Sequence, residues 1–209
     1  MLRDTLNRAV VSAYNTSNED LRVQVLTRHD PDVNEYASRI RALKDAKADI
    51  IGFLDDDAMY MPDTIEKVLP YFKKGYGFVQ GVVEVTGQKF AIYGTGVGTG
   101  TFIRKDAFDK IGYRFDLFGE EPRGTTGRGW RADSMLLADF LHVFGEDKYT
   151  LAGDVIIKHP EMMKGYFYED REKEFYYNYK EYADKYILPI DPRLQVYLHK
   201  WNKGKEQGV

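Results

Sequence analysis

The chain has 209 residues, a formal net charge of -3 and a pI near 5.9. That length suits one domain with a substantial core, and the weakly acidic charge argues against a general nucleic-acid-binding protein, whose surface would be basic. The absence of cysteine excludes disulfides and thiolate metal sites. The chain has neither a signal-peptide pattern nor an apolar run of membrane-spanning length, so we expect a cytoplasmic protein.

Helix patterns and strand patterns alternate along the first half of the chain. Apolar residues recur at helical spacing in three segments, and short apolar or alternating runs separate them. The segments expected to be helical are 2–13, 33–46 and 62–72, and those expected to be strands are 21–26, 50–54, 77–85 and 90–93. This alternation predicts an α/β fold with a mostly parallel sheet that helices cover on both sides.

Three consecutive aspartates, Asp55, Asp56 and Asp57, follow the apolar run 50–54. Carboxylates at the tip of a buried strand make an oxygen-rich site for a divalent cation and for the phosphates that it carries. Because side chains alternate along a strand, we expect Asp55 and Asp57 to face one way and Asp56 the other. One acid of the pair could then hold a metal and the other a sugar hydroxyl. The alternative is an acidic turn that caps the helix beginning near Pro62.

Two glycine-rich segments interrupt the regular patterns. Residues 94–100 read Gly-Thr-Gly-Val-Gly-Thr-Gly and lack the lysine of a phosphate-binding P-loop. We expect these glycines to let the backbone approach a ligand beneath the aspartates. Residues 119–131 form a long polar segment, which is typical of a functional lid, with an inert exposed loop as the alternative.

Regular patterns resume in the last third of the chain. A helix is expected over 133–144, with Gly145 as its stop. A short buried strand is expected at 155–157, followed closely by His159.

Residues 166–209 are rich in aromatic side chains at helical spacing. We expect amphipathic helices there that extend the domain formed by residues 1–165 and pack against it or against a second copy of the chain in a homodimer. Peripheral contact with a membrane is an alternative, although the polar face is mixed in charge rather than basic. The stripes consist of Phe175, Tyr179, Tyr182 and Tyr186, then of Leu194, Tyr197, Leu198 and Trp201.

The segment 36–57 resembles a block of the GT-A glycosyltransferases, family 2 in particular, in which an arginine precedes a strand that ends in a DxD motif. Arg39 falls on the arginine of that block, and Asp55 and Asp57 fall on the two acids of the motif. The resemblance implies a GT-A fold, in which a mostly parallel central sheet flanked by helices forms a Rossmann-like nucleotide-binding half.

Later segments follow the order of motifs in the same family, so that the resemblance spans residues 1–160. Residues 101–105 and 111–116 are similar to the family's FRR and GGFDE elements, and Asp133 stands where the family has its ED motif. His159 is similar to the late histidine that completes the metal site in many GT-A enzymes.

The resemblance implies a role for each matching residue in donor binding. Asp57 would ligate Mn2+ or Mg2+ on the diphosphate of a nucleotide sugar, with His159 as a further ligand. Asp55, also a candidate for the metal, would bind the ribose or the donor sugar together with Asp56, and Arg39 would lie near the nucleotide. A surface position for His159 and a solvated one for Arg39 are the alternatives.

A carboxylate is also needed to take the proton of the acceptor hydroxyl. The resemblance assigns this general base to Asp133. Glu121 and Glu120, in the long polar segment, are alternative bases, and Asp133 could instead cap the helix that it opens.

Two features depart from the family pattern. The strand with which family 2 enzymes open is absent or is replaced by residues 9–15. At residues 26–30, Leu-Thr-Arg-His-Asp stands where the family has VDDGS, so Asp30 is only a substitute for the carboxylate that meets the nucleotide base. The identity of the nucleotide therefore stays open.

These observations predict a metal-dependent glycosyltransferase, expected to be inverting, that moves a sugar from a nucleotide-diphosphate sugar to a hydroxyl of a glycan, protein or lipid. A nucleotidyltransferase would use the same acids to hold a metal and a triphosphate, without an acceptor base. A non-catalytic carbohydrate-binding or assembly protein is the third alternative.

Overall fold

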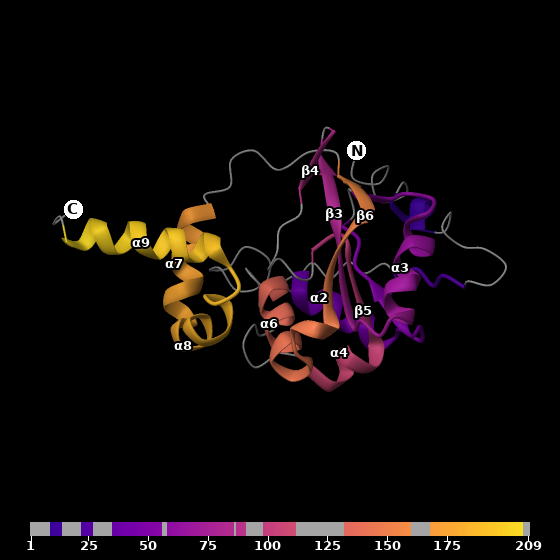
Figure 1. Ribbon diagram of the computed structural model, residues 1–209, viewed down its shortest axis with the longest axis horizontal. Coiled ribbons are helices and arrows are strands. Elements are labelled where there is room, and N and C mark those ends of the chain that lie inside the picture. Colours follow the sequence, from indigo (N-terminus) through magenta and orange to yellow (C-terminus); the bar gives the residue numbers. More distant parts are fainter. Residues whose placement is uncertain are drawn as a thin grey trace.

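The computed structural model describes residues 9–13, 22–26, 35–55, 58–85, 87–90, 98–111, 132–159 and 168–206. Within these ranges the chain forms a mixed sheet with helices on both faces, and the helices of the C-terminal part lie beside it (Figure 1). The predicted α/β class with flanking helices is confirmed.

The sheet of the described residues follows the order β1, β5, β3, β6, β2, and β4 pairs with the far end of β3. β3 and β6 are parallel neighbours, whereas the other pairs in this sheet are antiparallel. The strands are β1 (Ile50–Gly52), β2 (Met59–Tyr60), β3 (Phe78–Val85), β4 (Gln88–Phe90), β5 (Thr101–Arg104) and β6 (Tyr149–His159).

The strand directions differ from the mostly parallel sheet that we expected. β5 runs antiparallel between β1 and β3, so that β1, β3 and β6 point the same way although only β3 and β6 are direct neighbours. Residues 22–26, expected to form a further strand, form none in the described structure. Val25 does pack against the core, as its alternating pattern requires. An alternating pattern predicts which side chains are buried, but it does not show that the backbone pairs with a neighbouring strand.

The helices predicted at 33–46, 62–72 and 133–144 are confirmed, and residues 9–13 of the expected first helix are helical. Gly145 ends its helix as predicted, with φ of 85° and its N–H donating to the Leu141 carbonyl at 2.9 Å. The helices are α2 (Glu35–Lys44), α3 (Thr64–Lys73), α4 (Lys105–Ile111), α6 (Ala132–Phe144), α7 (Tyr168–Asn178), α8 (Lys180–Tyr182) and α9 (Pro192–Glu206), with short turns at Glu146–Lys148 and Ala183–Ile187.

Two apolar clusters lie on opposite faces of the sheet. Adjacent residues of one strand contribute to different clusters, because side chains alternate across a sheet: Phe78 joins the first cluster and Val79 the second. The first cluster also includes Phe108 of α4 and Phe140 of α6, and the second includes Val68 of α3. The sheet is thus held between α3 on one face and α4 with α6 on the other.

The C-terminal helices share the first cluster with α6, which lies between them and the sheet (Figure 1). Phe175 of α7, Ile187 and Leu194 are each at most 1 % exposed within this cluster. The hydroxyl oxygen of Tyr182 also lies 3.1 Å from the Met135 carbonyl oxygen of α6. No helix in the described ranges is both long and apolar enough to cross a membrane.

Candidate functional site

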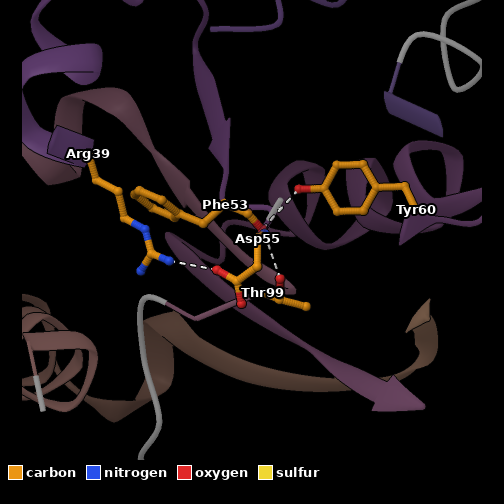
Figure 2. A network of polar contacts seen from close by, with 5 residues as sticks. All are labelled: Arg39, Phe53, Asp55, Tyr60 and Thr99. Atoms are coloured by element: carbon orange, nitrogen blue, oxygen red, sulfur yellow. Dashed lines mark hydrogen bonds and ion pairs between the residues drawn. The ribbon is translucent and has the colours of Figure 1, made fainter. Parts of the chain in front are cut away.

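Asp55 lies just beyond the carboxyl end of β1, where two other segments of the chain hold it. Its backbone N–H donates to the hydroxyl oxygen of Thr99 at 2.8 Å, and its Oδ1 accepts a hydrogen bond from Nη2 of Arg39 at 2.6 Å (Figure 2). The Arg39 and Asp55 side chains are 24 % and 28 % exposed, so the ion pair is reachable from solvent. The hydrogen bonds to the backbone N–H and to Oδ1 therefore fix the position of Asp55, while part of its carboxylate remains exposed to solvent.

The backbone immediately before Asp55 is fixed by three hydrogen bonds. The N–H of Phe53 donates to the Thr101 carbonyl at 2.9 Å, and the Phe53 carbonyl accepts from the N–H of Gly100 and the hydroxyl of Tyr60, each at 3.2 Å. Figure 2 shows Arg39 and Tyr60 on opposite sides of this segment. Because each of these partners comes from another element, the position of Asp55 is set by the fold rather than by its own loop.

Gly100 is the last residue of the glycine-rich segment and directly precedes β5. It has φ of 88°, and a Cβ at this position would lie 2.9 Å from Cδ1 of Ile157 on β6. A side chain would therefore be strained by both conformation and space. Here the glycine allows close approach to the protein's own strand, and the expected approach to a ligand stays a prediction.

Tyr60 packs against the segment that leads to Asp55. Its side chain is 8 % exposed, its ring stacks on Phe102 with centroids 5.5 Å apart, and its N–H donates to Oγ of Ser12 at 3.1 Å. A Cβ on Gly52 would lie 2.7 Å from its hydroxyl oxygen, so the ring occupies the space that this glycine leaves. Burial, with a smaller contribution from the charge of Asp55, raises the pKa of Tyr60 well above its usual value. The phenol therefore stays protonated and remains a donor.

A model of a known family matches residues 6–128, which is more than half of the chain, and its description is glycosyl transferase family 2. The chain belongs to glycosyl transferase family 2. This match confirms the predicted resemblance to family 2 of the GT-A glycosyltransferases. No curated protein matches the chain.

Solved structures of other proteins have a similar fold, and two of them are described here. One is Staphylococcus aureus TarS, residues 1–349, with 12 % identity and a TM-score of 0.53 over 82 % of this chain and 52 % of that one. The other is the mannosyltransferase PcManGT from Pyrobaculum calidifontis, with 16 % identity and a TM-score of 0.51 over 79 % of this chain and 49 % of that one. The family 2 chain described here thus spans about half the length of either protein.

His159, which we predicted to be a metal ligand, lies at the carboxyl end of β6, opposite Val85 of β3. The strand β2 begins two residues after Asp57, and its Met59 pairs with Lys158 of β6. Continuing this antiparallel register by one residue sets His159 level with Ala58, the residue directly after Asp57. The strand pairing therefore brings Ala58 to the same edge of the sheet as His159.

Other predicted site residues lie outside the described part of the chain, namely Asp30, Asp56, Asp57, Glu120 and Glu121. The backbone of Asp133 is the second residue of α6, but its side chain is also outside the described set. Within the described residues, no group of three or more acidic or histidine side chains is arranged to hold a metal.

Sequence reasoning missed the residues that support Asp55. Thr99 stands inside the glycine-rich run, where a hydroxyl between glycines was the only signal, and its contact with Asp55 spans 44 residues. Tyr60 belongs to a two-residue strand and had no pattern to mark it. Both contacts arise from the tertiary fold.

Proposed function

We propose that this chain forms the donor-binding and catalytic part of a metal-dependent glycosyltransferase, which transfers a sugar from a nucleotide-diphosphate sugar to an acceptor hydroxyl. The observation that carries the proposal is the position of Asp55, held by Arg39 and Thr99 at the edge of the sheet where β6 ends in His159. The relatives support the donor class, since TarS is in complex with UDP-GlcNAc and PcManGT with GDP-Man and Mn2+.

We assign Asp55 and Asp57 to different parts of the donor. Oδ1 of Asp55 accepts from a guanidinium at 2.6 Å, and a divalent cation beside it would be repelled by that positive charge. Asp55 therefore suits a ribose or donor-sugar hydroxyl, with Asp56 beside it, better than a metal. Asp57 and His159 would hold Mn2+ or Mg2+, because carboxylate oxygens suit such ions and an imidazole is an acceptable ligand for Mn2+. When bound, the cation would neutralise the charge of the diphosphate leaving group.

The acceptor side of the reaction needs a base, and we assign it to Asp133. This residue opens α6, and a carboxylate there would take the proton of the acceptor hydroxyl as the oxygen bonds to the anomeric carbon and the bond to the diphosphate breaks. Attack from the face opposite the leaving group would invert the anomeric centre. Glu121 is the alternative base. We expect the acceptor hydroxyl to belong to a glycan, a protein or a lipid, and homodimer or membrane contact through α7 and α9 remains a prediction.

The proposal is tested by thermal melting with a panel of UDP-sugars and GDP-sugars in the presence and absence of Mn2+. A donor at 100 times its Kd stabilises the folded state by about 2.7 kcal/mol, which raises the Tm of a domain of this size by about 5–10 °C. Asp55→Asn should reduce that shift. Asp63→Asn is the matched control, because Asp63 pairs with Lys67 on the exposed start of α3 and should leave the shift unchanged.

The product that is released distinguishes glycosyl transfer from nucleotidyl transfer. Release of nucleoside diphosphate supports glycosyl transfer, whereas release of pyrophosphate would mean a nucleotidyltransferase. A Tm that no donor raises, or a shift that Asp55→Asn leaves at the parental value, would contradict the assignment of the site.

A further inference from the structure

A cleft of about 200 Å3 opens between the end of α4, α6 and the C-terminal helices. It is smaller than the roughly 300–1,000 Å3 of pockets that enclose drug-sized ligands, so its size fits a single small ring. His142 and Val143 of α6 are exposed at its mouth, so it is open to solvent. The lining residues are Ile111, Asp139, His142, Val143, Tyr182 and Tyr186.

This cleft lies at the opposite end of the sheet from Asp55. The last turn of α6 carries His142 and Val143 and leads through Gly145 to the start of β6, where Tyr149 pairs with Phe78 at the start of β3. Asp55 instead follows the end of β1, which points the same way as β3 and β6. Through β5, Ile51 is level with Phe78, so Asp55 lies four residues further along the sheet than the start of β3.

The cleft combines a held carboxylate with aromatic rings. Asp139 is 9 % exposed, and its Oδ1 accepts a hydrogen bond from the hydroxyl of Tyr182 at 2.6 Å. The ring of Tyr182 lies 5.0 Å from that of Tyr186, which in turn meets the His142 imidazole edge-on at 5.0 Å. A carboxylate has about four positions that accept hydrogen bonds, so Asp139 can serve Tyr182 and a ligand hydroxyl together.

The backbone that carries Tyr186 is also unusual. Residues Ala183–Ile187 form a π-helical turn that packs against α6. Such turns make up well under about 1 % of residues and occur frequently at functional sites. This feature is independent of the side-chain chemistry and points to the same cleft.

We propose that this cleft binds a neutral sugar ring, independently of the donor site. The apolar C–H face of a sugar would pack on the tyrosine rings and Val143, and its hydroxyls would bond to Asp139 and His142. An anionic ligand such as a phosphate would be repelled by the Asp139 carboxylate. The neighbouring ammonium groups of Lys110 and Lys185 lie over the rings of Phe144 and Tyr186, at 5.1 and 4.8 Å, and are outside the lining.

Saturation-transfer NMR with methyl glycosides of glucose, galactose, mannose and N-acetylglucosamine at millimolar concentration tests this inference. We expect transfer to at least one glycoside in the parent chain and its loss in Val143→Lys, whose new side chain fills the cleft. Val143 is 43 % exposed, so the substitution should not disturb the core, and Val196→Lys on α9, where the valine is 69 % exposed, is the matched control. The control should bind as the parent does.

Asp139→Asn provides a second variant. Its amide oxygen can still accept from Tyr182, so the fold should persist while the Kd for the glycoside rises about tenfold or more. The inference is overturned if no glycoside receives saturation from the folded parent, if Val143→Lys binds as the control does, or if Asp139→Asn leaves the Kd unchanged. The nucleotide-sugar melting shift, measured on the same samples, reports the donor site separately, so failure here is distinct from failure of the proposed function.

Discussion

The close packing of Tyr60 over Gly52 predicts that substitutions at these two positions are coupled. A Cβ on Gly52 would lie 2.7 Å from the Tyr60 hydroxyl and 2.8 Å from Cε1 of Phe102, so Gly52→Ala must displace one of these rings. Such overpacking costs about 1–3 kcal/mol, and the lower entropy of the unfolded chain returns about 0.4–1 kcal/mol. We expect a net loss in the free energy of unfolding of about 1–2 kcal/mol.

Tyr60→Phe should lower the free energy of unfolding by less, because no buried acceptor loses all its hydrogen bonds. The Phe53 carbonyl would keep its hydrogen bond from the Gly100 N–H, so only the net value of one hydrogen bond, about 0.5–1.5 kcal/mol, is lost. In the double variant the closest contact of the new methyl group disappears while the contact with Phe102 remains. The two changes should therefore cost about 0.5–1 kcal/mol less together than the sum of their separate costs.

Urea unfolding followed by circular dichroism measures these free energies, provided that the slope with denaturant stays constant among the variants. Gly153→Ala is the matched control, since nothing lies within 4 Å of a Cβ built at this strand position. It should be neutral or stabilising by up to about 1 kcal/mol. The reasoning would be refuted if Gly52→Ala matched Gly153→Ala in stability, or if the double variant were additive.

Three further predictions concern the proposed reaction. Asp57→Ala should abolish Mn2+-dependent nucleotide binding by calorimetry without unfolding the chain, because it would remove the proposed principal metal ligand. His159→Ala should weaken Mn2+ binding, measured by calorimetry, because it would remove the proposed imidazole ligand. Asp133→Asn should lower the transfer rate by about two to four orders of magnitude in a product-release assay, with donor binding nearly unchanged, because it removes only the base.

Each of these has a result that contradicts it. An unchanged affinity for the metal and nucleotide in Asp57→Ala would mean that other acidic residues bind the metal. An unchanged affinity for Mn2+ in His159→Ala would make this histidine structural. Parental transfer by Asp133→Asn, combined with an inactive Glu121→Gln, would place the base in the long polar loop.

The sequence predicted those features that depend on local pattern. The helical pattern over residues 62–72 predicted α3, and Gly145 marked the end of α6, because helical periodicity and a positive φ leave clear traces in residue type. Asp55 at the tip of β1 could be predicted for the same reason, since a buried run ended in acids.

Strand direction and long-range support could not be predicted in this way. Apolar alternation states which side chains are buried, but it does not distinguish a parallel from an antiparallel neighbour, so the insertion of β5 between β1 and β3 left no signal. The contact of Thr99 with Asp55, and that of Tyr60 with Phe53, depend on segments that meet only after the sheet has formed.

The cluster shared by α6 and the C-terminal helices also affects how the chain folds during synthesis. Met135 and Phe140 of α6 emerge from the ribosome before Ile187, Leu194 and Trp201, with which they form one core. At about 5–20 residues per second, α6 would wait several seconds for the last of these partners. We therefore expect the apolar face of α6 to be a chaperone-binding surface on the nascent chain, one that disappears only when α9 has been made.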